Sequence, residues 1–223
     1  MNALRRLHLR LAVPPTPFRM NPRLDQLVED LCRKGEDGAR VLNLGAGSAS
    51  LEGRVVNLDI ERFAGVHVCG DGEALPFRAG TFAAVLLRGV LEHVRSADRV
   101  LEQTRCVLRP RGLIYVEVPF LQPFHSSPED HRRFTLNGIR AFLSGFEEIE
   151  AGVQIGPGST LAWISQEALA ALLAFGSVKA YVRIRALLGW ATFWLKHLDR
   201  LVVPAPFVAN SASALYFLGR KRG

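Results

Sequence analysis

The chain has little cysteine and no apolar run long enough to cross a bilayer. Only three of its 223 residues are cysteines, and none stands in a CxxC pair or beside a pair of histidines. We therefore expect no disulfide framework and no structural metal. The odd number of cysteines and the broken apolar pattern at the N-terminus, which is unlike a secretory signal, favour the cytoplasm.

A third glycine is missing from the loop after the first predicted strand. Residues 41–44 form a short apolar run typical of a buried parallel strand, and Gly45 and Gly47 follow it. A dinucleotide site needs GxGxxG at the start of a long helix that holds the pyrophosphate, but Ser50 stands at the third position. The segment 45–54 is also too short for such a helix. These features exclude the dinucleotide fingerprint and favour a nucleoside cofactor without a pyrophosphate.

An acidic residue ends the second predicted strand, which begins at Val55 and runs to Asp59. A carboxylate at this place can accept hydrogen bonds from both hydroxyls of a ribose. S-adenosylmethionine presents a ribose, an adenine and an amino-acid tail without a pyrophosphate. The glycine pair and Asp59 together therefore predict an S-adenosylmethionine site.

Strand-like and helix-like segments alternate along the following residues. Further strands are predicted within 65–77, ending at Asp71, and within 81–94, 113–119 and 146–156, with a helix over 97–108 and a last strand over 214–221. Such alternation predicts right-handed crossovers and a mostly parallel sheet.

Six motifs over residues 40–150 occur in a familiar order. They are LNLGAG, NLD, DGEALPF, VLEHV, CVLRPRG and HSSPEDHRRFT. In this respect the chain resembles the class I S-adenosylmethionine-dependent methyltransferases. The resemblance implies a Rossmann-like α/β fold with a mostly parallel seven-stranded sheet flanked by helices, and a helical insertion before the last strand.

The resemblance also implies a set of cofactor-binding residues. It places Asp59 on the ribose, Ile60 against the adenine, and Asp71 with Gly72 near the adenine amine. The remaining implied residues are the loop after the first strand and the lining of the sulfonium side: Asn43, Gly45, Ala46, Gly47, Arg88, Gly89 and Val90. Most class I members carry an acid where Asn43 stands. Its side-chain oxygen can still accept from the cofactor's ammonium, but without a charge.

Methyl transfer from a sulfonium is an in-line displacement, and an oxygen or nitrogen acceptor must also lose a proton. Candidate bases follow the fourth and fifth strands: Glu92 and His93, and His125 in a long proline-punctuated loop. We expect Glu92 to be a helix-start acid and His93 to be a packing residue. His125 is therefore the predicted catalytic base, with a solvent-exposed loop histidine as the alternative.

The segment after His125 has two interpretations. One of its arginines could hold a carboxylate or phosphate with Asp130 orienting it, or Asp130 and Arg133 could only staple the loop. Thr135 is expected to cap the helix over 135–143.

We expect a basic N-terminal arm over 1–20 and one methyltransferase domain over 21–223, with a helical insertion at about 160–203. The arm is either solvated or a membrane or partner contact. Basic residues cut the apolar runs of the insertion far below the roughly 20 residues that span a bilayer. The insertion is therefore a cap on the sheet, a homodimer face, or a pair of amphipathic helices at an anionic membrane surface.

These observations predict a cytoplasmic S-adenosylmethionine-dependent methyltransferase, peripheral at the inner face of the membrane if the insertion binds lipid. The resemblance alone suggests a small-molecule or glycan-like, including lipid-linked, acceptor. The net charge of +7 raises the question of nucleic acid, but the arginines are scattered and no RNA-binding module is visible. The alternatives are a non-catalytic scaffold or membrane-associated assembly protein, an RNA methyltransferase, and an NAD-dependent oxidoreductase.

Overall fold

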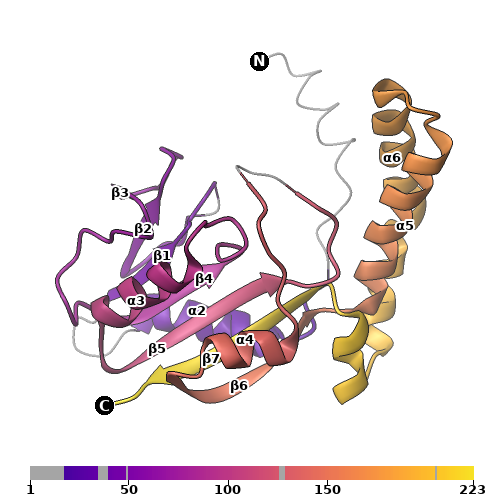
Figure 1. The fold of residues 1–223 in the computed structure, drawn as a ribbon. Helices are drawn as coiled ribbons and strands as arrows, with labels where there is room; N and C mark the ends of the chain where they lie inside the picture. The colour runs from indigo at the N-terminus through magenta and orange to yellow at the C-terminus, as the bar shows by residue number, and fades with distance from the viewer. Residues whose placement is uncertain (1–17, 35–39, 49, 126–128, 204) are drawn as a thin grey trace. The chain divides into compact units, whose positions relative to one another are not determined.

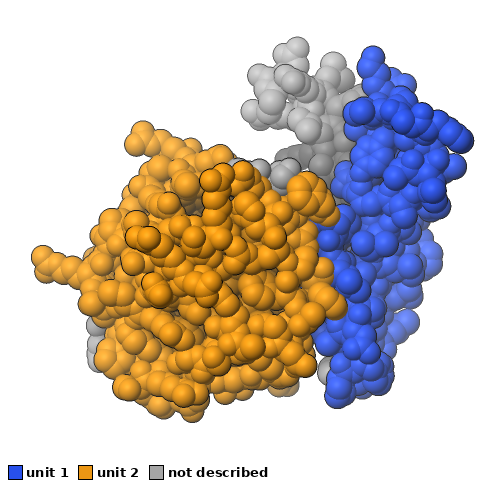
Figure 2. Space-filling view, in the orientation of Figure 1, with its two compact units in different colours: residues 1–20, 121–123, 153–214 blue, residues 21–120, 124–152, 215–223 orange. Residues whose placement is uncertain are grey.

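The computed structural model describes residues 18–34, 40–48, 50–125, 129–203 and 205–223 (Figure 1). Most of the predicted N-terminal arm lies outside these residues. The chain divides into two compact units, which Figure 2 colours separately. We name residues 21–120, 124–152 and 215–223 the sheet unit, and residues 1–20, 121–123 and 153–214 the helical unit.

The sheet unit is built on seven strands in the order β3-β2-β1-β4-β5-β7-β6. The strands are β1 (Arg40–Leu44), β2 (Val55–Asp59), β3 (Val68–Cys69), β4 (Phe82–Arg88), β5 (Leu108–Pro119), β6 (Phe146–Ile155) and β7 (Ala214–Lys221). The predicted Rossmann-like fold is confirmed. The third strand is shorter than expected and ends before Asp71.

The inner strands of the sheet are parallel, and most of their residues are buried, as in a sheet covered on both faces. β1 lies between β2 and β4, with Asn43 opposite Asn57 on one side and Leu86 on the other. β2 also pairs with β3, and β4 with β5, in parallel. Figure 1 shows β7 running opposite to β5. The parallel register brings the carboxyl ends of β1, β2 and β4 to the same edge of the sheet.

Helices cover both faces of this sheet. In Figure 1, α2 (Pro22–Lys34) lies behind it, and α3 (Ala97–Val107) and α4 (Leu136–Phe142) lie in front. The buried side of α3 carries apolar residues that recur three, four or seven positions apart: Ala97, Val100, Leu101 and Val107. Thr135 caps α4, because its side-chain oxygen accepts from the Gly138 N–H at 3.0 Å.

The helical unit contains α5 (Pro157–Leu173), α6 (Val178–Thr192) and the 3-10 helices η2 (Phe193–Leu201) and η3 (Pro206–Ser211). α5 packs against both α6 and η2. α5, α6 and η2 occupy most of the predicted insertion at about 160–203, and η3 lies beyond it. Over the described residues, every helix is too short or too polar to cross a membrane.

A buried carboxylate starts α5. Asp199, in η2, accepts hydrogen bonds from the N–H groups of Gly158 and Ser159 at 2.6 and 3.1 Å, and from the Ser159 hydroxyl at 2.7 Å. The helix N-terminus carries unpaired N–H groups and a partial positive charge, which an acid satisfies and neutralises. Asp199 therefore joins the two ends of the 157–199 segment.

We expect Asp199→Ala to lower the free energy of unfolding by about 2–4 kcal/mol, because it leaves buried donors without an acceptor. Chemical denaturation followed by circular dichroism measures this loss. The control is Asp98→Ala in the exposed first turn of α3, with an expected loss of about 0.3–1 kcal/mol. Equal losses in the two variants would contradict the role of Asp199.

Candidate functional site

The end of β2 contacts the loop that follows β1. The Gly47 N–H donates to Oδ2 of Asp59 at 2.7 Å, and the Glu61 N–H donates to Oδ1 at 2.9 Å. Asp59 is buried, with 8% of its surface exposed. A carboxylate has about four acceptor sites on its two oxygens. Asp59 therefore joins both strand ends and retains lone pairs that can accept from a ligand.

The glycine loop is also held by the backbone. The N–H groups of Gly45 and Ala46 both donate to the carbonyl oxygen of Leu58, at 2.9 and 3.0 Å. The predicted loop residues and the end of β2 are thus brought together as the sequence indicated.

The two predicted glycines have different surroundings. Both have positive φ, +68° at Gly45 and +55° at Gly47. A Cβ on Gly45 would lie 2.5 Å from Cγ2 of Val90, whereas a Cβ on Gly47 would meet no described atom within 4 Å. Gly45 is therefore required by packing against Val90. Gly47 presents bare backbone to open space beside the Asp59 carboxylate, as a ligand cradle requires.

Asn57 organises this edge and was missed by sequence reasoning. Its Oδ1 accepts from Asn43 Nδ2 at 2.9 Å and from the Leu51 N–H at 3.1 Å, while its Nδ2 donates to the carbonyl oxygens of Leu51 and Gly65. A polar residue inside the otherwise apolar VVNLD strand was the available signal. Because Asn43 uses its Nδ2 in this bond, its Oδ1 stays available as the predicted acceptor.

The other predicted cofactor residues lie at the same edge. Ile60 directly follows β2 and is 63% exposed, so it offers an apolar surface next to Asp59. Gly72 packs against Leu44 at the end of β1. Asp71 is exposed and accepts from the Glu73 N–H at 2.8 Å.

β4 ends with the residues predicted to line the sulfonium side. Arg88 is the last residue of the strand, and the Gly89 N–H, at φ +68°, donates to the carbonyl oxygen of Glu117 on β5 at 3.0 Å. Val90 follows and is buried. The turn after β4 therefore contacts the loop that follows β1, through Val90 and Gly45, and also contacts strand β5, through Gly89 and Glu117.

Three titratable side chains meet beyond β4 and β5. Ligand atoms of Glu92, His93 and His125 all lie within 4.8 Å of one another, and the two imidazole rings meet edge to face at 5.0 Å. His93 Nδ1 donates to the carbonyl oxygen of Glu129, which leaves Nε2 facing Glu92 Oε1 at 3.8 Å. The sequence did not predict this grouping, because His125 comes from a distant loop.

Glu92 is the most buried member of this cluster. Its Oε2 has no hydrogen-bond partner among the described residues, and burial raises its pKa. A buried carboxyl group of raised pKa beside two imidazoles can exchange protons with them. Two imidazoles and a carboxylate also suit a divalent transition metal. The expectation of no metal stays a prediction.

Asp130 fastens the loop that carries His125. It accepts from the His125 N–H at 2.9 Å and from Arg133 Nη2 at 2.6 Å. The hydrogen bonds from Arg133 lower the pKa of Asp130 to about 2. The interpretation of Asp130 and Arg133 as a loop staple agrees with these contacts, and the staple positions His125.

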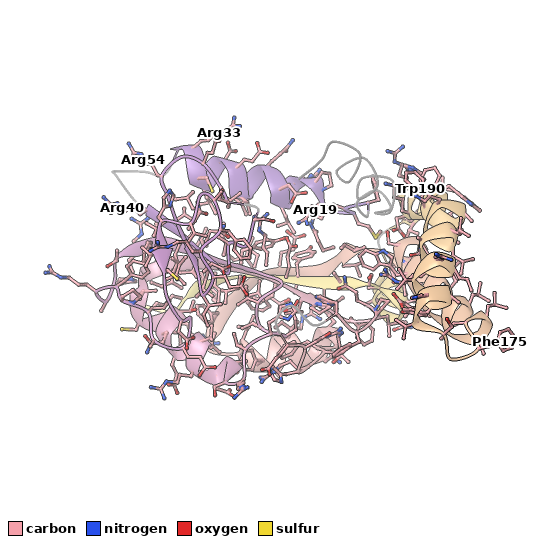
Figure 3. All side chains as sticks on the ribbon, turned by 90° about the horizontal axis from the view of Figure 1, so that it is seen from above. Arg19, Arg33, Arg40, Arg54, Phe175 and Trp190 are labelled. Carbon is pink, nitrogen blue, oxygen red and sulfur yellow. The ribbon has the colours of Figure 1, made fainter. Side chains whose placement is uncertain are left out.

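A hollow of about 450 Å³ lies at the edge of the sheet opposite to Asp59. Arg40, Arg54, His67 and the amino ends of β1 and β2 line it, and Figure 3 shows both arginines. Ligands of open parallel sheets bind beyond the carboxyl ends of the strands. We therefore place the candidate site at the Asp59 edge.

The comparison with protein families agrees with this geometry. Residues 41–116 match the family model described as a methyltransferase domain, which covers the Gly45–Gly47 loop, Asp59 and Gly89. Over this segment, about a third of its length, the chain is similar to a methyltransferase domain. No curated protein sequence matches it significantly.

Solved structures share the fold of this chain. One is the 1,6-didemethyltoxoflavin-N1-methyltransferase of Burkholderia thailandensis, which was crystallised with S-adenosylhomocysteine. The two sequences are 17% identical, the match covers 92% of this chain and 78% of that chain, and the TM-score is 0.53. Another is phosphoethanolamine N-methyltransferase 2 of Haemonchus contortus, in complex with S-adenosylmethionine. It is 17% identical, the match covers 90% of this chain and 53% of that chain, and the TM-score is 0.52. The [4+2]-cyclase SpnF also matches, with 16% identity, 90% and 80% coverage and a TM-score of 0.50.

We expect Gly45→Ala to destabilise the methyltransferase by about 2–4 kcal/mol, since it adds a positive-φ penalty to a clash with Val90. Denaturant unfolding of Gly45→Ala, Val90→Ala and the double variant measures the coupling. Removing the valine methyls should relieve the clash, so the double variant should lose at least about 1 kcal/mol less than the sum of the single losses. Additive losses would show that the two residues do not meet.

Proposed function

We propose that this methyltransferase binds S-adenosylmethionine at the Asp59 edge and transfers its methyl group to a small-molecule or glycan-like acceptor. The observation that carries the proposal is the contact between Asp59 and the Gly47 N–H, at 2.7 Å, beside the open space at Gly47. It supports a single pocket formed by the ends of β1 and β2.

The residues at this edge suit the parts of the cofactor. Asp59 has acceptor capacity for ribose hydroxyls, and the exposed side chain of Ile60 can cover an adenine. The Asn43 oxygen can accept from the ammonium of the amino-acid tail. The turn at Arg88, Gly89 and Val90 would line the sulfonium side. These four assignments are proposals that follow the family resemblance.

His125 is the proposed catalytic base. Bound S-adenosylmethionine supplies an electrophilic methyl group. The acceptor hydroxyl or amine gives its proton to an imidazole nitrogen of His125, while its lone pair forms the bond to the methyl carbon and the carbon–sulfur bond breaks. Asp130 holds the backbone of His125, and His93 packs against its ring. S-adenosylhomocysteine and the methylated acceptor leave.

A small-molecule acceptor is favoured over nucleic acid. The toxoflavin methyltransferase of similar fold was crystallised with the small molecule 1,6-didemethyltoxoflavin. A lipid-linked glycan would suit a cytoplasmic enzyme that works at the inner face of a membrane. The shared fold of a cyclase shows why activity must be tested, since this architecture also supports other reactions.

We expect Gly47→Ala to weaken S-adenosylmethionine binding at least ten-fold, because its methyl group would enter the open space beside Asp59. Gly80→Ala is the matched control: Gly80 also has positive φ, +69°, and its Cβ would meet only the Arg109 Cα, at 4.0 Å, at the amino end of β4. Both variants should lose about 1 kcal/mol of stability from backbone strain. In calorimetry, only Gly47→Ala should bind S-adenosylmethionine more weakly than the wild type does.

The same titration separates the competing functions. S-adenosylmethionine and S-adenosylhomocysteine should bind, and NAD should not. Binding of NAD instead would favour the oxidoreductase, and binding of none of the three at millimolar concentration would favour a non-catalytic scaffold. Equal affinities of Gly47→Ala and Gly80→Ala would remove Gly47 from the site.

We expect His125→Ala to slow turnover by roughly 10²–10⁴-fold with unchanged S-adenosylmethionine affinity, as loss of a general base does. Turnover is followed as transfer of an isotopic methyl label into a cell extract, and solvent partition of the label separates water-soluble from lipid-linked acceptors. His131→Ala in the same loop is the control and should stay active. Full activity of His125→Ala would refute the role of His125 as the base. Loss of wild-type activity on chelation would instead favour a metal ion held by His125 with Glu92 and His93.

A further inference from the structure

The α5–α6 pair exposes an extensive apolar surface. α6 is largely apolar, yet Gly189 is its only buried residue in the structure. The exposed large apolar side chains of the two helices and the turn between them are Leu161, Ile164, Leu169, Leu172, Leu173, Phe175, Val178, Val182, Leu187 and Trp190. Monomeric proteins rarely expose large apolar patches unless the patches bind something.

Specific contacts hold the two helices together, so the exposed surface does not come from loose packing. Glu167 of α5 accepts from the Tyr181 hydroxyl and from Arg185 of α6. Gln166 Nε2 donates to the Thr192 hydroxyl at 2.7 Å, and Ala170 is fully buried. The pair is a defined hairpin whose inner faces are satisfied.

The most exposed apolar residues gather where the two helices turn. Leu172, Leu173, Phe175 and Val178 are 71%, 51%, 91% and 76% exposed. Phe175 also has a positive φ of 45°, which is unfavourable for an aromatic residue. Its ring points away from both helices in Figure 3. Packing within the described residues does not explain an aromatic side chain here, whereas insertion into an apolar medium does.

The charges around this apolar tip all have one sign. No acidic residue occurs between Glu167 and Asp199, while Lys179, Arg183, Arg185 and Lys196 fall within that stretch. Lys179 and Arg183 lie in the first two turns of α6, directly after the tip, and are exposed. Basic residues beside apolar and tryptophan side chains are the pattern of elements that lie in the headgroup region of an anionic bilayer.

We propose that the α5–α6 hairpin docks the enzyme on an anionic phospholipid surface, with the tip of Leu172, Leu173, Phe175 and Val178 entering the headgroup–acyl boundary. Charge favours lipid over a second copy of the chain. A symmetric dimer through the tip would bring the Lys179 and Arg183 of both copies together, whereas anionic headgroups neutralise them. This inference concerns location and is independent of the methyl-transfer chemistry.

Sedimentation of the full chain with phosphatidylglycerol–phosphatidylcholine vesicles tests the proposal. The tip variant replaces Leu172, Leu173, Phe175 and Val178 with serine and should lower the vesicle partition coefficient at least ten-fold. Phe207→Ser is the matched control, because Phe207 is 70% exposed in η3 of the same unit but lies outside the hairpin. It should sediment like the wild type.

The electrostatic part is tested separately. Lys179→Gln with Arg183→Gln should weaken binding to anionic vesicles by about five-fold for each charge removed, and should make binding less sensitive to salt. Both residues are exposed, so the variant should fold. The unchanged wild type should bind pure phosphatidylcholine vesicles more weakly than the anionic ones.

Any of four outcomes would overturn the proposal. The wild type could fail to sediment at low salt, or the tip variant could sediment as well as Phe207→Ser. Alternatively, analytical ultracentrifugation could find a dimer that the tip variant converts to a monomer, without vesicle binding in either. Calorimetry with S-adenosylmethionine on the same samples keeps this test distinct from that of the enzyme. Loss of vesicle binding on changing Arg5, Arg6 and Arg10 to glutamine, with the tip variant unaffected, would assign binding to the N-terminal arm.

Discussion

The candidate site depends on how the Asp59 carboxylate is used. Its two oxygens accept backbone N–H groups from the loop after β1 and from the turn after β2. A buried acid loses hydration, and such hydrogen bonds to its charged form offset this loss. These two bonds fix the position of the carboxylate relative to the ends of both strands, so the geometry of this edge is set by the chain's own backbone.

Short-range patterns predicted this edge well. A buried apolar run, two glycines and an acid at a strand end are local features, and the parallel register does the rest. The sequence did not reveal that Gly45 is needed for close packing whereas Gly47 faces open space, since that difference depends on where Val90 packs. It also did not reveal Asn57 as the centre of a buried polar network, because asparagine at that position reads equally well as a strand irregularity.

The cluster of His93 and His125 was harder to predict, because it depends on contacts between segments that are distant in the sequence. His93 and His125 come from loops that only the fold brings together, and His125 is positioned by Asp130, which Arg133 holds in turn. Contacts between distant segments leave no periodic signal. The helical segment was predicted from its composition, but its pairing through Glu167, Tyr181 and Arg185 was not. Composition indicates that a helix is apolar, whereas its partners are set by tertiary packing.

The Asp199 bond to the first turn of α5 has a consequence for the history of the chain. The two ends of the segment 157–199 lie side by side, because the Asp199 carboxylate at its end accepts hydrogen bonds from the first turn of α5 at its start. Segments whose ends meet are the ones that proteins accept as insertions or exchange between relatives. The rest of the chain can therefore keep its path when residues between these two ends change, because the entry and the exit of the segment stay side by side.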